Sequence, residues 1–344
     1  MSAQLPGAEA SAGAAQIMPW QQGLREQLVK LMRADKLPHA LLLEGAPGSG
    51  RNGFAQALAR ELLCEAPNVE GYCDACKSCA LCAAGSHADL RHLSPAQAGK
   101  SIGIDSVRRA IEFCAETASL GARKVLLVSP LESLTQAAFN AFLKCLEEPA
   151  AGTFMLLVSA RGHRLPATVR SRCQRWNVPQ PQTAQALAWL EAQLDEPARS
   201  RVADQSEAQT SGDPRAGLER LLRISAGAPL TARALLGSDE CAALMALDAL
   251  RAQAGAGQTV ARARVERAAA ALEPDRLLDY LEREAARWLK AQRLDGLRAP
   301  AGLDMLRALD KLRRLRRARQ AGSNPNTELL RFQALTACRG LWAA

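Results

Sequence analysis

Five cysteines lie close together in the sequence, with spacing typical of a metal site. Cys64 is followed by eight other residues, and Cys73, Cys76, Cys79 and Cys82 then follow with gaps of two residues. Gaps of two residues let successive thiolates converge on one ion in tetrahedral geometry. Because no secretory segment opens the chain, we expect a cytoplasmic, reducing compartment. Clustered cysteines in such a compartment indicate metal ligands rather than disulfides.

Zinc is the predicted metal, and its predicted ligands are Cys64, Cys73, Cys76 and Cys79. Four thiolates close the coordination shell and leave no open position for water, which indicates a structural role. An iron–sulfur cluster is the alternative, because the last four cysteines resemble a ferredoxin run. That run has three residues before its fourth cysteine and a proline after it. Here two residues precede Cys82 and Ala83 follows it, so Cys82 is left outside the predicted ligand set.

A glycine-rich turn precedes the cysteines and has the layout of a phosphate-binding loop. An apolar run leads into the turn GAPGSG, and a helical pattern follows. Gly45 and Gly50 have the spacing of the nucleotide motif G-x-x-x-x-G-K-[ST]. However, Arg51 stands at the lysine position, and Asn52 stands where a hydroxyl would hold Mg²⁺. A strand–turn–helix whose glycines merely allow a tight turn is the alternative to a degenerate nucleotide loop.

An ATPase of this class also needs an acidic residue after its second core strand, to hold Mg²⁺. The predicted strand at 125–128 instead runs into Ser129 and Pro130. Glu132 is acidic but lies further along, and we expect it at a solvated helix start. The lysine, the hydroxyl and the carboxylate are therefore all replaced, so we expect this chain neither to bind nor to hydrolyse ATP.

Apolar runs that could form buried strands alternate with helical patterns, which predicts a parallel α/β sheet. The predicted strands are 41–43, 90–93, 125–128, 154–158 and 174–178. The predicted helices of this region are 21–35, a segment after the glycine turn, 104–118, 133–146 and 165–171. Asp105 is expected to cap the helix at 104–118.

Beyond Pro179 the strand signals stop and helical patterns dominate. Helices are predicted at 183–194 and 218–236, the second broken at 227–229, with a polar loop or insertion at 195–217. From 238 to 344 the sequence is rich in Ala, Leu and Arg, and we predict helices throughout. One of them is crowded with the basic residues Arg307, Lys311, Arg313, Arg314, Arg316, Arg317 and Arg319. We interpret that face as solvated or as a subunit contact, and contact with phosphates is the alternative.

The composition of the 344 residues limits the possible functions. Apolar residues make up 48% of the chain, which is ample for buried cores, and aromatic residues only 4%. So few aromatics argue against a stacking platform for single-stranded nucleic acid. The net charge of +9 suits a polyanionic partner such as DNA. No apolar run is long enough to predict a membrane span, and the Ala-, Gly- and Ser-rich start is predicted to be a disordered tail.

Four stretches together resemble the delta-prime family of clamp-loader subunits of bacterial DNA polymerase III, which belongs to the AAA+ ATPases. They are the loop at 41–52, the cysteine cluster, the run NAFLKCLEEP at 140–149, and Ser171-Arg172-Cys173. The run at 140–149 is specific to clamp-loader subunits. The motifs carry the resemblance from about residue 20 to residue 236, and the C-terminal part shares only helical character and length.

The resemblance implies a tail at 1–19 and an α/β AAA+ P-loop core at 20–178 with an inserted zinc module at 64–82. It further implies a helical lid at 179–237 and an all-α, oligomerising collar at 238–344. The implied function is that of a stator subunit that does not hydrolyse ATP. It would form a ring with motor subunits and a clamp-opening subunit, as part of the DNA-directed DNA polymerase holoenzyme. This ring would load the sliding clamp onto primed DNA.

The resemblance also gives Arg172 a role, that of an arginine finger in a neighbouring subunit's ATP site. A guanidinium supplied in this way stabilises the charge that develops on the γ-phosphate. A surface or salt-bridged arginine is the alternative. Motor subunits carry a second, nucleotide-sensing arginine, and Leu230 stands at the matching position here.

Two other functions stay open at this point. In the first, the chain is an active clamp-loader ATPase in which Arg51 and Asn52 still bind Mg–ATP. In the second, it is a zinc-containing DNA-binding protein without ring partners. Nucleotide binding tests the first, and tight, salt-sensitive DNA binding by the isolated chain tests the second.

Overall fold

The computed structural model describes residues 15–97, 99–160, 162–194, 214–320 and 326–342. Its contacts divide the chain into two compact units, 1–181 and 182–344. Most of the predicted tail, 1–14, and most of the predicted insertion, 195–213, lie outside the described residues.

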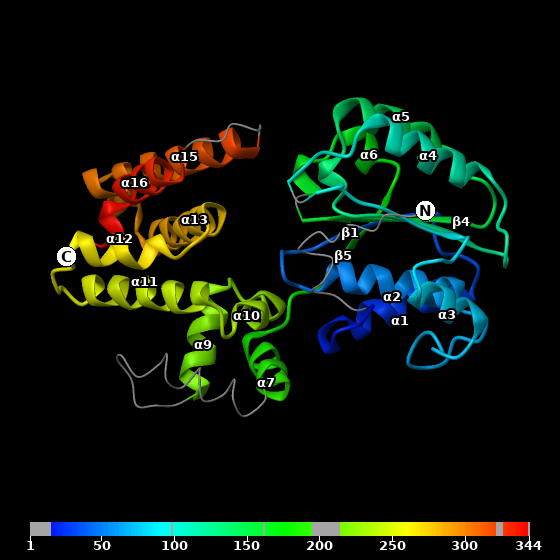
Figure 1. Ribbon diagram of the computed structural model, residues 1–344, viewed down its shortest axis with the longest axis horizontal. Coiled ribbons are helices and arrows are strands. Elements are labelled where there is room, and N and C mark those ends of the chain that lie inside the picture. The colour runs from blue at the N-terminus through cyan, green and yellow to red at the C-terminus, as the bar shows by residue number, and fades with distance from the viewer. Residues whose placement is uncertain (1–14, 98, 161, 195–213, 321–325, 343–344) are drawn as a thin grey trace. The chain divides into compact units, whose positions relative to one another are not determined.

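The first unit is built on a parallel sheet of five strands (Figure 1). The strand order is β2-β3-β4-β1-β5, and every neighbouring pair is parallel. The strands are β1 (Ala40–Glu44), β2 (Leu90–Leu93), β3 (Lys124–Val128), β4 (Thr153–Ser159) and β5 (Gln174–Asn177). The predicted α/β class is therefore confirmed for this unit. The three central strands read as continuous apolar runs because both faces of a parallel sheet are covered.

Helices cover both faces of this sheet (Figure 1). The helices are α1 (Gln22–Arg33), α2 (Arg51–Leu63), α3 (Lys77–Ala83), α4 (Ile104–Ala115), α5 (Gln136–Glu147) and α6 (Ala167–Arg170). Side chains alternate between the faces with the strand period of two residues. In β1, Leu42 packs in one core with α4 and α5, whereas Leu41 and Leu43 pack in the other with α1 and α2.

The structure corrects the beginnings of two predicted helices. Gly103 is the N-cap of α4, and the Asp105 carboxylate instead accepts a hydrogen bond from Arg108, so Asp105 does not cap the helix. Helix α5 begins at Gln136 because the Thr135 hydroxyl caps it by accepting from the backbone N–H of Ala138.

Glu132 also differs from its expected place. It lies in a 3₁₀ turn, Leu131–Ser133, and not at the start of a helix. Its side chain is half-buried, and one carboxylate oxygen accepts from the backbone N–H of Ala160 at 3.1 Å. Glu132 therefore ties the turn after β3 to the end of β4 and is not a solvated residue.

The second unit is helical throughout its described part (Figure 1). Its helices are α7 (Thr183–Gln193), α9 (Pro214–Ile224), α10 (Pro229–Leu235), α11 (Asp239–Gly255), α12 (Arg262–Ala270), α13 (Pro274–Ala291), α14 (Leu294–Arg298), α15 (Pro300–Gln320) and α16 (Thr327–Ala337). Residues 214–217, predicted as loop, open α9. The predicted break at 227–229 is present, and the division of this unit into lid and collar stays a prediction. No helix within the described ranges is long and apolar enough to cross a membrane.

Two buried acidic residues connect helices inside the second unit. Asp248 of α11 is 1% exposed and accepts hydrogen bonds from Arg220 and Arg223 of α9, at 2.6 to 3.0 Å. Glu284 of α13 is 2% exposed and pairs with Arg251 of α11 at 3.0 Å. These contacts join α9, from the predicted lid, to α11 of the predicted collar, and join α11 in turn to α13.

Candidate functional site

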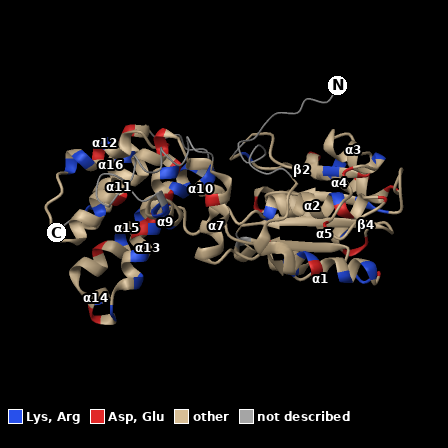
Figure 2. Ribbon diagram, turned by 90° about the horizontal axis from the view of Figure 1, so that it is seen from below, with Lys and Arg blue, Asp and Glu red and all other residues tan. Residues whose placement is uncertain are grey.

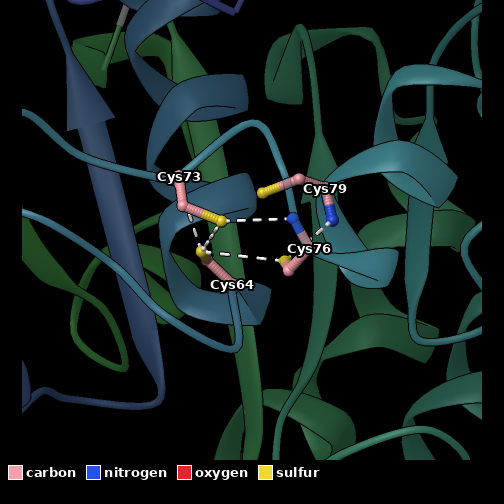
Figure 3. A group of neighbouring side chains, drawn as sticks. All are labelled: Cys64, Cys73, Cys76 and Cys79. Carbon is pink, nitrogen blue, oxygen red and sulfur yellow. Dashed lines mark hydrogen bonds between the residues drawn. The ribbon is translucent and has the colours of Figure 1, made fainter.

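Four cysteine thiols converge at the end of α2 (Figure 3). Cys64 follows the last turn of α2, Cys76 caps α3, Cys79 lies within α3, and Cys73 comes from the loop between these helices. The four sulfur atoms all lie within 4.8 Å of one another. The sulfur of Cys64 is 3.6 Å from that of Cys73 and 4.0 Å from that of Cys76. Tetrahedral zinc bound by thiolates at about 2.3 Å requires sulfur–sulfur separations of about 3.8 Å.

This arrangement can therefore hold a metal ion, and it contains the four predicted ligands. Cys82, one turn further along α3, lies outside the group. Hydrogen bonds from the backbone N–H groups of Ala75 and Cys76 lower the pKa of the Cys73 thiol to about 6. Burial raises the pKa of Cys79 to about 12. A bound metal would have to displace the proton of such a thiol, as is usual for cysteine ligands.

Two arginines fix the cysteine loop to the helices beside it. Arg25 of α1 forms a buried ion pair with Glu61 of α2 at 2.7 Å, and its second terminal nitrogen donates to the carbonyl oxygen of Val69 at 2.8 Å. Arg60 of α2 stacks over the ring of Tyr72 and pairs with Asp74. The loop that carries Cys73 is thus held to α1 and α2 by contacts that do not involve the cysteines.

The glycine turn between β1 and α2 bonds to side chains of this chain. The guanidinium of Arg51 donates to the carbonyl oxygen of Gly45 at 3.0 Å, and Arg51 is only 8% exposed. The amide oxygen of Asn52 accepts from the hydroxyl of Ser129, at the end of β3, at 2.8 Å. Gly50 has the left-handed φ of +87° that the turn requires. The side chains at the lysine and hydroxyl positions of the motif are therefore both engaged within the protein.

Arg172 lies just after α6, against the end of α5. Its Nε donates to Oε1 of Glu147 at 2.5 Å, its Nη2 contacts the same oxygen, and its Nη1 donates to the carbonyl oxygen of Thr168 at 2.9 Å. One third of the Arg172 side chain is exposed. Within this chain Arg172 therefore forms a salt bridge, as the alternative to the arginine-finger interpretation predicts. The pairing leaves its role toward another subunit untested.

Comparison with known proteins finds a matching family and several relatives of this chain. Residues 20–182 match the family described as DNA polymerase III, delta subunit. DNA polymerase III subunit delta' of Pseudomonas aeruginosa is 43% identical over 224 residues, which cover 65% of this chain and 62% of the relative. The same subunit of Escherichia coli is 38% identical over 221 residues, 64% of this chain and 61% of the relative. The chain is a relative of the delta-prime subunits of DNA polymerase III.

The chain matches about three fifths of the length of these delta-prime subunits. A solved structure of a DNA polymerase III gamma subunit-related protein from Thermotoga maritima is 20% identical, with a TM-score of 0.48. That likeness covers 91% of this chain and 98% of the solved one.

Four of the seven basic residues on helix α15 of this chain pair with acidic residues. Figure 2 shows basic and acidic residues interspersed along the helices of the second unit. Arg314 pairs with Asp310 of the same helix, Arg319 with Asp275 of α13, and Arg316 with two acidic residues of α13. The buried side of α15 is lined by Leu309 and Leu312. Because much of the positive charge of α15 is neutralised within the unit, this helix is better suited to packing within the protein than to binding phosphates.

Two contacts of the candidate site residues could not be predicted from the sequence. Glu147 belongs to the run at 140–149, but nothing in the run predicts that its carboxylate meets Arg172, 25 residues away. The sequence likewise predicts no partner for the hydroxyl of Ser129, which the structure shows donating to the amide oxygen of Asn52. The only available signal was the position of each residue at an element end, where side chains of neighbouring elements meet.

Proposed function

We propose that this chain is a non-hydrolysing subunit of a DNA polymerase III clamp loader. The kinship with delta-prime subunits supports the assembly. The observation that carries the non-hydrolysing role is the glycine turn, in which Arg51 and Asn52 bond to protein atoms at the positions where an ATPase contacts phosphate and Mg²⁺. Arginine is no simple replacement for the lysine, because its planar fork is bulkier and prefers bidentate geometry.

In this proposal the chain completes a ring with motor subunits and a clamp-opening subunit. The ring loads the sliding clamp onto primed DNA as part of the DNA-directed DNA polymerase holoenzyme, in the cytoplasm. The α/β core at 20–178 carries the site residues, the segment 179–237 acts as a lid, and 238–344 forms the oligomerising collar. The helical character of the second unit supports this assignment.

The metal in this proposal is a structural zinc ion held by Cys64, Cys73, Cys76 and Cys79. The spacing of the sulfur atoms supports a tetrahedral site, and a shell of four thiolates leaves no position for a substrate. When bound, the ion crosslinks the end of α2 to the start of α3. This crosslink would hold a stretch of chain that has little apolar core of its own.

Arg172 is the residue that the proposal assigns to chemistry. Its guanidinium enters the ATP site of a neighbouring motor subunit and stabilises negative charge on the γ-phosphate as the phosphoryl bond breaks. An arginine supplied in this way accelerates hydrolysis roughly 10³- to 10⁵-fold in GTPases. The partly exposed position of Arg172, at the end of α6, supports this role.

The test is a reconstituted loader in which this chain carries Arg172→Ala. We expect clamp- and DNA-stimulated ATP turnover at the neighbouring site to fall at least roughly 10³-fold. The KM for ATP should change little, because the motor subunit's own loop binds the nucleotide. Arg175→Ala is the matched control, since Arg175 is a nearby exposed arginine that pairs with Glu44. Full turnover with Arg172→Ala would refute the arginine-finger role.

A further inference from the structure

Hydrogen-bond acceptors from two different helices contact the guanidinium of Arg172. Glu147 is the last residue of α5, and Thr168 lies in the short helix α6. The Nε and Nη2 nitrogens face a single carboxylate oxygen of Glu147, and Nη1 donates to the Thr168 carbonyl. All three nitrogen atoms of the guanidinium are therefore located by protein acceptors.

These contacts leave part of the guanidinium's donor capacity available. An arginine side chain has five N–H donors, one on Nε and two on each terminal nitrogen. One donor of each nitrogen is directed to Glu147 or Thr168. One N–H on Nη1 and one on Nη2 remain. Two donors on the terminal nitrogens form the fork that binds two oxygens of a phosphate group.

We propose that Glu147 is a positioning residue that orients Arg172 toward the γ-phosphate of a neighbouring subunit. This inference rests on the proposed function, because it needs Arg172 to act in trans. Glu147 touches neither nucleotide nor metal and acts only through Arg172. Its carboxylate binds the edge of the guanidinium formed by Nε and Nη2. Arg172 can therefore keep this contact while the remaining N–H groups of its terminal nitrogens bind phosphate oxygens.

The physical reason for such a residue is the freedom of a long side chain. An arginine without a partner samples many rotamers, and few of them point the guanidinium at a phosphate. A small misplacement of a catalytic group can cost about a hundredfold in rate. A single surface ion pair would hold the side chain weakly. Here a two-nitrogen contact and a backbone acceptor act on a side chain that is two-thirds buried.

The first test uses the reconstituted loader and compares Glu147→Ala, Arg172→Ala and the double variant. We expect Glu147→Ala to lower kcat for ATP at the neighbouring site about tenfold or more. KM should stay within about twofold, because a contact made only in the transition state affects kcat alone. The double variant should be no slower than Arg172→Ala, since Glu147 acts through that arginine. Glu148→Ala, which removes the adjacent exposed carboxylate at the same helix end, is the matched control and should retain wild-type kcat.

Two results of this experiment would overturn the inference while leaving the arginine finger intact. One is wild-type kcat for Glu147→Ala in a loader that Arg172→Ala inactivates. The other is a double variant whose loss is the product of the two single losses, since Glu147 would then act independently of Arg172. A loader that is fully active with Arg172→Ala is a different result, because it refutes the arginine finger itself and with it the role of Glu147.

A second measurement tests the contact without any loader. In the full chain labelled with ¹⁵N-arginine, the Nε–H signal of Arg172 is the one that disappears in Arg172→Lys. We expect this proton to exchange with water at least about tenfold faster in Glu147→Ala than in wild type or in Glu148→Ala. Equal exchange rates in all three proteins would mean that Glu147 does not hold Arg172, and would overturn the inference whatever the loader does.

Discussion

The guanidinium of Arg51 lies 3.0 Å from the carbonyl oxygen of Gly45, within the turn that binds phosphates in nucleotide loops of this type. Such loops bind phosphate with backbone N–H groups and a lysine that extends to the terminal phosphates. Here the positive side chain that follows the turn points back to the turn's first residue. The side chain at the lysine position is therefore bonded to the turn itself and does not extend toward the place of a bound phosphate.

We predict that the purified chain does not bind Mg–ATP. A ligand would have to displace Arg51 from Gly45, and Asn52 from Ser129, and would then find neither lysine nor hydroxyl. Calorimetric titration should show no binding with a dissociation constant below about 1 mM, equivalent to about 4 kcal/mol. A micromolar dissociation constant would instead mean that Arg51 and Asn52 work as substitutes, and would favour an active ATPase subunit.

Metal analysis of the chain should find about one zinc ion per molecule. Cys76→Ser removes a ligand that also caps α3, so we expect loss of the metal and rapid proteolysis within residues 64–82. A metal chelator should have the same effect on the wild-type chain. Cys82→Ser is the control, because Cys82 lies outside the four-sulfur group and its loss should leave the zinc content unchanged. Iron in place of zinc, with a brown protein, would contradict this prediction.

The strands and most helices could be predicted because buried positions are occupied by apolar residues, whose spacing can be read from the sequence. Strands β3 and β4 are buried on both faces and read as unbroken apolar runs. Helix α3 was missed because it has only seven residues, two of them cysteines, and its cap is the Cys76 sulfur rather than a hydroxyl. The start of α5 was misplaced because Ser133 and Thr135 are both plausible caps, and only the structure shows that Thr135 accepts the hydrogen bond.

The site was predictable where its residues are close in sequence, and not where the fold brings them together. The four cysteines span 16 residues, and their spacing alone defines the metal cluster. The contact between Glu147 and Arg172 depends on how α5 and α6 pack against each other. Sequence patterns give the order of elements along the chain but not the strand order that sets such contacts.

Gly152 is predicted to be the glycine of the first unit least tolerant of substitution. Its φ is +75°, and a Cβ at this position would lie 2.3 Å from the backbone oxygen of Ala122. Gly152→Ala should lower the free energy of unfolding by about 2 kcal/mol or more, from left-handed strain and a backbone clash. Gly121→Ala is the control: no atom lies within 4 Å of its Cβ position, so the change should stay within about 0.5 kcal/mol. Equal stabilities of the two variants in denaturant titrations would contradict the prediction.

The contacts of Asp248 predict the largest stability loss in the second unit. Its buried carboxylate faces Arg220 and Arg223 of α9 and Arg251 of α11, and Arg251 also pairs with Glu284 of α13. Asp248→Asn leaves these arginines without their shared anion, and breaking a buried pair costs about 3 kcal/mol. Hydrogen exchange in peptides from α9, α11 and α13 measures the loss. Asp310→Asn, at an exposed pair with Arg314, should cost under about 1 kcal/mol.

The same carboxylate gives the second unit a predicted acid sensitivity. Burial opposes the ionisation of Asp248, but hydrogen bonds from Arg223 and Arg220 outweigh it and lower the pKa of the carboxyl. Because the folded pKa lies below the unfolded value of about 3.9, the stabilisation is complete above that value and is lost as the pH falls through the folded pKa. Exchange protection of α9 and α11 should therefore fall below about pH 4 in the wild type, and less steeply in Asp248→Asn. An identical pH dependence in both proteins would show that Asp248 is not the group responsible.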